Sequence, residues 1–107
     1  MAFYELRQYK ILPGKMAAWV DLMETVIIPF QTSKGMVITA SFSGEEDDSI
    51  YIWMRRFASE EERAALYEAV YESDTWKNEI GPQIPDLMDL SGINVTRLLA
   101  TPKSVAQ

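Results

Sequence analysis

The sequence has 107 residues, of which 48% are hydrophobic and 24% charged, a balance typical of one folded domain spanning residues 1–107. Ten Lys and Arg residues against sixteen Asp and Glu residues give a net charge of −6, which disfavours binding to nucleic acid or to an anionic membrane surface. The chain has no cysteine and no histidine, which excludes disulfides, thiolate or imidazole metal ligands and catalysis by an imidazole base.

No apolar run approaches the roughly 20 residues that a membrane span needs, and the first residues lack the basic and apolar regions of a targeting segment. We therefore expect a cytoplasmic protein without a membrane partner. With the usual ligand side chains missing, we also expect neither a metal nor a cofactor.

The first third of the chain predicts a strand followed by a helix. Residues 3–11 mix three aromatic residues with polar ones, and Pro13-Gly14 ends the strand in a turn. Residues 15–30 carry apolar side chains at helical spacing, which predicts one buried helix face. Pro29 is expected to end or kink this helix near Ile28, because a proline disfavours helical geometry in the residue before it.

The middle of the chain predicts a hairpin and a second helix. Residues 36–42 and 50–57 are β-like runs joined by a long acidic loop. Ser59 and Glu62 have the spacing of a capping box, so a helix is expected to start there. The acidic loop lacks the ligand spacing of a calcium loop and is interpreted as a solvated turn.

The last third predicts short elements and a final strand. Ser73-Asp74 is expected to cap a short helix that Gly81-Pro82 stops. A further helical turn is expected around residues 87–90, and residues 93–99 form the last strand. The order β, α, β, β, α, short α, β predicts an α+β, ferredoxin-like βαββαβ fold, with a four-stranded antiparallel sheet and helices on one face.

Alternation along the first and third strands predicts which side chains share a face of the sheet. Burying Glu5 and Arg7 in an aliphatic core is costly, so their row is expected to face away from the helices. The row expected beneath the helices comprises Tyr4, Leu6, Ile50, Ile52 and Met54. The opposite row comprises Phe3, Glu5, Arg7, Tyr9, Tyr51, Trp53, Arg55 and Phe57.

The predicted open face is expected to be covered by a second copy of the chain, since a contiguous aromatic patch is unlikely to stay in water. Two sheets meeting face to face would form a dimeric α/β barrel and enclose a cavity. The candidate ligand-binding residues of that cavity are Glu5, Arg7, Tyr9, Tyr51, Trp53 and Arg55. Arg97 is left out, because it shares its parity along the last strand with apolar residues.

Two guanidinium groups against one carboxylate leave a local positive surplus, so a small ligand with an anionic group is expected, with Trp53 or Tyr9 stacking on its planar part. Glu5 is the only candidate acid or base, and whether any reaction occurs stays open. An alternative is a non-enzymatic interaction or scaffold protein, in which the same residues only build a dimer interface. An RNA-recognition fold shares this element order but is disfavoured, because the third strand lacks its aromatic motif.

The sequence resembles the NIPSNAP family, within the dimeric α/β-barrel superfamily, over nearly its whole length. The matching residues are Tyr4-Glu5-Leu6-Arg7 with Tyr9 and Pro13-Gly14, Trp53 with Arg55 and Arg56, Ser73 with Trp76, and Thr101-Pro102 with Ser104. The resemblance implies a ferredoxin-like subunit whose sheet pairs with that of a second subunit. It implies no particular reaction, because the family has no established common chemistry.

Overall fold

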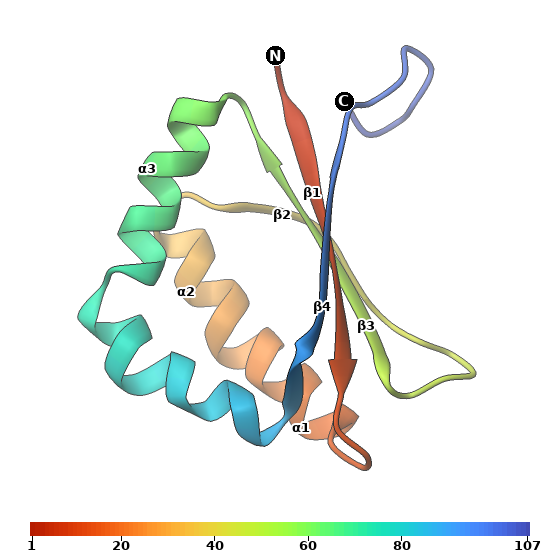
Figure 1. The fold of residues 1–107 in the computed structure, drawn as a ribbon. Coiled ribbons are helices and arrows are strands. Elements are labelled where there is room, and N and C mark those ends of the chain that lie inside the picture. The colour runs from red at the N-terminus through yellow and green to blue at the C-terminus, as the bar shows by residue number, and fades with distance from the viewer.

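The structure is a computed structural model that describes all residues 1–107, and its four strands form one antiparallel sheet in the order β2-β3-β1-β4 (Figure 1). The strands are β1 (Phe3–Ile11), β2 (Val37–Ser43), β3 (Ile50–Phe57) and β4 (Met88–Leu98). The predicted α+β fold is confirmed, and the predicted bounds of the first and third strands match the structure.

The helices all lie on one side of the sheet (Figure 1). The first helical segment runs through α1 (Met16–Leu22), a π-helical turn η1 (Met23–Ile27) and α2 (Ile28–Ser33). The second comprises α3 (Glu60–Tyr71), a π-helical turn η2 (Trp76–Ile80) and a 3-10 helix η3 (Gly81–Asp86). None of these helices is both long and apolar enough to cross a membrane.

Helix α3 begins as the capping-box spacing predicts. The Ser59 hydroxyl accepts a hydrogen bond from the Glu62 backbone N–H at 3.1 Å. The Glu62 carboxylate reaches back to the backbone N–H of Ala58 at 3.3 Å, one residue before the expected partner. Both bonds satisfy amides that would otherwise lack a partner at the helix start.

The helix ends expected at two prolines have different outcomes. The first helical segment does not end at Pro29 but continues to Ser33, and Ile28 keeps helical angles. The wide π turn directly before Pro29 accommodates a proline that could not donate a regular helical hydrogen bond. The short helical turn η2 does end at Ile80, before Gly81-Pro82, as predicted, and the chain continues as the 3-10 helix η3, whose first turn tolerates a proline.

The last strand begins earlier than predicted, at Met88, so the expected helical turn at residues 87–90 is wrong. Gln8 pairs with Asn94 and Lys10 pairs with Asp89, so that residues 90–93 bulge out opposite the single residue between Gln8 and Lys10. The Asp89 carboxylate stabilises the bulge by accepting hydrogen bonds from the backbone and hydroxyl of the same serine two residues later.

The two faces of the sheet are the reverse of those predicted. Glu5 and Arg55 have no exposed side-chain surface, because they lie beneath the helices and bond to residues of α2 and α3. Their row is buried because each charge gains hydrogen-bond partners there, which offset the cost of burying an unpaired charge. The aliphatic row is on the face without helices, where Ile52 and Met54 are half-buried.

The hydrophobic core fills the space between the helices and the row of β1 and β3 that faces them. It contains two clusters of buried side chains, one beneath the C-terminal half of β1 and one beneath the N-terminal end of β1. The first comprises Tyr9, Ile11, Trp19, Leu22, Met23, Ile27, Tyr51, Trp53, Ile80 and Met88, and the second Phe3, Met36, Phe57 and Val70.

Candidate functional site

The Glu5 carboxylate, on β1, is the centre of a buried polar network between the sheet and α3. Its Oε1 accepts hydrogen bonds from Tyr67 Oη at 2.6 Å and from Arg55 Nη2 at 2.7 Å. Its Oε2 accepts from Arg63 Nε at 2.9 Å, and Arg7 Nη1 lies 3.4 Å from Oε1. Both oxygens of this carboxylate therefore accept from donors of the protein itself, three of them at or near Oε1 and one at Oε2.

Arg55, on β3, crosses from the sheet to both helical segments. Its Nη1 donates to Gln31 Oε1 at 2.9 Å and to Tyr71 Oη at 2.8 Å, and its Nη2 donates to Tyr67 Oη at 2.8 Å as well as to Glu5. The guanidinium lies 4.7 Å from the centre of the Trp53 ring, a cation–π distance. Arg55 thus ties β3 to α2 and α3, with only its Nε left without an acceptor.

The ionisation states follow from this arrangement. Burial by itself raises the pKa of Glu5, but the hydrogen bonds from Tyr67 and Arg55 outweigh it and hold that pKa at about 2. Burial raises the pKa of Tyr67 to about 12, so its hydroxyl stays a donor. Burial would lower the pKa of Arg7, but nearby groups, Tyr9 foremost, raise it, and Arg7 stays a cation.

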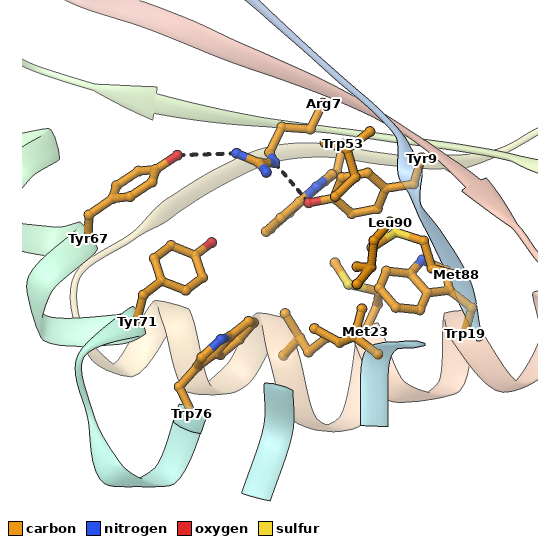
Figure 2. A pocket seen from close by; sticks show the side chains of 13 residues that line it. Arg7, Tyr9, Trp19, Met23, Trp53, Tyr67, Tyr71, Trp76, Met88 and Leu90 are labelled. Atoms are coloured by element: carbon orange, nitrogen blue, oxygen red, sulfur yellow. Dashed lines mark hydrogen bonds between the residues drawn. The ribbon is translucent and has the colours of Figure 1, made fainter. Parts of the chain in front are cut away.

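A pocket of 310 Å³ lies beside this network, between the sheet and the helices (Figure 2). Its size is at the small end of the range for ligand pockets, about 300 to 1,000 Å³. Twelve of its thirteen lining residues are hydrophobic. They are Arg7, Tyr9, Trp19, Met23, Ile27, Trp53, Tyr67, Tyr71, Trp76, Ile84, Met88, Leu90 and Ile93.

Arg7 is the only charged residue that lines the pocket. Its Nε donates to Tyr9 Oη at 2.8 Å, and its Nη1 lies 3.3 Å from Tyr67 Oη (Figure 2). Its Nη2 makes no hydrogen bond to the protein, and the side chain keeps 18% of its surface exposed. In contrast to Arg55, whose two terminal nitrogens are both fully used, Arg7 has donor capacity left for a molecule in the pocket.

Two buried indole groups in the pocket wall also lack an acceptor. Trp19 and Trp53 are 1% and 2% exposed, and neither Nε1 has a hydrogen-bond partner. The Trp53 N–H lies close to the Tyr9 hydroxyl without the geometry of a hydrogen bond. Because buried polar groups are nearly always paired, these two unpaired indole donors are an unusual feature of the residues that line the pocket.

Both π-helical turns of the chain border this pocket. Met23 and Ile27 come from η1, and Trp76 comes from η2. Such turns are rare in helices and frequent at functional sites. The Ser73 hydroxyl, predicted to cap the short helix, accepts from the Trp76 backbone N–H at 3.1 Å and so fixes where η2 begins.

Of the six residues predicted for the site, three line the pocket and three do not. Arg7, Tyr9 and Trp53 line the pocket. Glu5 and Arg55 lie beside it in the polar network, and the Tyr51 hydroxyl bonds to Ser41 on β2 instead. The predicted location between two sheets is wrong for all six, because their row faces the helices of their own chain. The interpretation of these six residues as a dimer interface is wrong for the same reason.

Sequence reasoning missed the contribution of the helices. Tyr67 and Tyr71 lie four residues apart on α3, a spacing that puts both hydroxyls on the side facing the sheet. Gln31 on α2 is fully buried, a rare state for glutamine that no local pattern indicates. Arg97 does not line the pocket, since its guanidinium packs on the Phe3 ring at 3.9 Å and pairs with an exposed glutamate.

The fold is shared with known proteins. The NIPSNAP family model matches residues 4–103. The chain is similar to a NIPSNAP family protein from Agrobacterium tumefaciens, with 24% identity, a TM-score of 0.88 and full coverage of both chains. It is also similar to a second NIPSNAP family protein of unknown function from that organism, with 21% identity, a TM-score of 0.88 and coverage of 99% and 94%.

A third similar structure is an uncharacterised NIPSNAP-like domain protein from Burkholderia xenovorans, with 16% identity, a TM-score of 0.85 and coverage of 96% of this chain and 88% of the other. No curated protein sequence matches the chain. The structural similarity supports the fold, and the family model covers nearly all of the sequence. The chain therefore belongs to the NIPSNAP family.

Proposed function

We propose that this chain binds a small, largely apolar molecule with an anionic group in the pocket between its sheet and its helices. The observation that carries the proposal is an apolar cavity of 310 Å³ with a single cation, Arg7, whose Nη2 is free. An apolar pocket with a few convergent polar groups is the usual form of a small-molecule site.

The walls favour a planar or aromatic ligand body. Trp19, Trp53 and Trp76 present ring surface to the cavity, with aliphatic residues completing the lining. An anionic group would lie at the Arg7 end, where it is paired with a guanidinium and does not remain uncompensated in an apolar space.

The polar end of the pocket is suited to binding and offers no base. Arg7 is a cation, and burial raises the pKa of Tyr9. The carboxylate of Glu5 has four donors around it and a pKa of about 2, so it is a weak proton acceptor at neutral pH. Proton abstraction from a ligand is therefore not part of this proposal.

Calorimetric titration with 2-naphthoate, a two-ring aromatic carboxylate, tests the pocket directly. The rim residue Leu90 is 54% exposed, so Leu90→Trp should fill the entrance without disturbing the core. Leu99→Trp is the matched control, because Leu99 is 62% exposed and lies outside this pocket. We expect the wild-type chain and L99W to bind and L90W to bind at least about tenfold more weakly. Absence of binding to the wild-type chain, or equal binding by L90W, would refute the proposal.

The open face of the sheet is the proposed site of a second copy. No helix covers it, and Phe42, which pairs with the half-buried Ile52, is 62% exposed. Leu6 and Met54 extend this apolar surface across the two central strands. An apolar patch on an uncovered sheet face, here bordered by Gln8, Lys10 and Arg56, is a common self-association surface, and two-fold homodimers are the commonest way to cover one.

Analytical ultracentrifugation at several protein concentrations tests the dimer. Phe42→Asp places a charge on the open face, and Ala65→Asp places one at an exposed position of α3. We expect dimers for the wild-type chain and A65D, and monomers for F42D with unchanged circular dichroism. A wild-type chain that sediments as a monomer at all concentrations would exclude this partner.

A further inference from the structure

The Tyr71 hydroxyl, which lines the pocket, is held by two donors of the buried network. It accepts hydrogen bonds from Arg55 Nη1 at 2.8 Å and from Gln31 Nε2 at 3.3 Å. A hydroxyl has two acceptor positions and one proton. With both acceptor positions used, Tyr71 has only its proton left to offer, and no acceptor for it lies within the protein. Figure 2 shows this hydroxyl directed into the pocket below Arg7.

The direction of both hydrogen bonds is fixed by chemistry. Arg55 is a donor with no acceptor atoms, so the Gln31 atom 2.9 Å from its Nη1 must be the carbonyl oxygen. The other end of the Gln31 side chain is then the amide nitrogen, which donates to Tyr71. Because Arg55 and Gln31 are both fully buried, neither can exchange these partners for water.

The remaining polar groups at this end of the pocket are also hydrogen-bond donors without an acceptor. Arg7 Nη2 has free N–H groups, and the Tyr9 hydroxyl, which already accepts from Arg7 Nε, has no acceptor for its own proton. A ligand group placed here meets only unpaired donors. It must be an acceptor, and an amide or amine would put its own N–H groups against them.

We infer that the anionic group of the ligand is a monocarboxylate that accepts hydrogen bonds from Tyr71 Oη and Arg7 Nη2, and that Arg55 and Gln31 are positioning residues that make Tyr71 an obligate donor. This inference rests on the proposed function of the pocket, and it adds the class of ligand and the reason for the buried Arg55–Gln31 pair.

The charge balance selects one negative charge over two. Glu5 accepts from three arginines, and of these only Arg7 reaches the pocket. One guanidinium with one free nitrogen can compensate a carboxylate. The second negative charge of a phosphate monoester dianion would have no further cationic side chain to contact in the apolar pocket, which is unfavourable.

Titrations with 2-naphthoate, 2-naphthamide and 2-naphthyl phosphate test the inference, since these probes share one ring system. For the wild-type chain we expect the acid to bind at least about tenfold more tightly than the amide, and the phosphate more weakly than the acid. Tyr71→Phe should reduce acid binding about tenfold and change amide binding less.

Substitution of Gln31 tests the positioning role. Gln31→Glu replaces the amide nitrogen with an oxygen that accepts the Tyr71 proton, so the preference for the acid should fall about as much as in Y71F. Gln31→Met also removes the amide N–H but supplies no acceptor for the Tyr71 proton, so the preference should fall less than in Q31E. A role of Gln31 in folding alone would affect both variants alike, and circular dichroism and thermal unfolding of each variant provide the check.

The outcomes separate the two proposals. If naphthoate binds and L90W blocks it, but Y71F and Q31E keep the wild-type preference, the inference is wrong and the proposed pocket function stands. Tighter binding of the phosphate likewise overturns the inference alone, whereas equal affinity for acid and amide also contradicts the anionic group of the proposed function. If none of the three probes binds the wild-type chain, both the inference and the proposed function are wrong.

Discussion

Replacing Glu5 with glutamine keeps the shape of the side chain and removes the one negative charge of the buried network. Two guanidinium groups, those of Arg55 and Arg7, would then lie in the interior without a carboxylate, and the amide nitrogen would face donors. Breaking a buried ion pair by removing one partner typically costs about 3 to 5 kcal/mol. We expect a loss of this size in the free energy of unfolding at neutral pH.

The pKa gives an independent estimate of the same contribution. Glu5 has an ordinary pKa of 4.5 and a pKa of about 2 in the folded chain, a difference worth about 3 kcal/mol. Because the folded-state pKa is the lower one, this stabilisation is fully present above pH 4.5 and is lost as the pH falls towards 2. The stabilisation expected from the ion pairs and that given by the pKa of Glu5 are therefore of the same size.

Urea unfolding followed by tryptophan fluorescence measures both effects. The control is Glu68→Gln, at an exposed position of α3 that forms no ion pair, which should change stability by less than about 0.5 kcal/mol. Between pH 4.5 and pH 3 the wild-type chain should lose more stability than E5Q, which lacks the titrating group. If E5Q lies within about 1 kcal/mol of the wild-type chain, or both show the same pH dependence, the Glu5 network does not stabilise the fold as argued.

Three further substitutions test neighbouring parts of the structure by the same unfolding measurement. Tyr67→Phe removes the 2.6 Å hydrogen bond to Glu5, so we expect a loss of about 1 to 3 kcal/mol and acid unfolding at a higher pH; an unchanged acid midpoint would contradict this. Ser59→Ala removes the cap of α3 and should cost about 1 kcal/mol, against no change if the capping bond is unimportant. Gly35→Ala should cost about 1 to 2 kcal/mol, because Gly35 has φ of +106° and a Cβ there would lie 3.1 Å from Leu66; a neutral effect would mean that the turn relaxes.

The elements were predictable because their signals are local. Alternating β-branched and aromatic residues define β3, and the serine and glutamate at the start of α3 define its cap. The helix end predicted at Pro29 failed because the irregular turn before it makes a proline acceptable. Nothing in a single sequence indicates a π turn or the bulge of β4, since both depend on packing against other elements.

The faces of the sheet illustrate most clearly what could not be predicted from the sequence. Alternation sorted the residues of β1 and β3 into two correct sets, and the error was in which set meets the helices. Glu5 looked too costly to bury because its partners Arg55 and Tyr67 are 50 and 62 residues away in the chain. A buried charge can be recognised from sequence only when the donors that compensate it can be recognised too.

The wide turn η1 determines what the first helical segment presents to the sheet. Trp19, Met23, Ile27 and Gln31 are all buried and lie four residues apart. On a regular helix, residues at this spacing drift around the axis by about 40° per step, or about 120° over the row. An i→i+5 turn holds one extra residue, which offsets much of this drift.

The polar glutamine thereby stays in line with the apolar residues before it and reaches Arg55. Deleting one exposed residue of the turn, such as Thr25, would restore regular winding and rotate α2 by about 100° relative to α1. Gln31 would then turn away from the sheet, while every side chain of the network remained in the sequence. The length of this helical segment, counted in single residues, is thus as much a determinant of the site as the identity of the residues that line it.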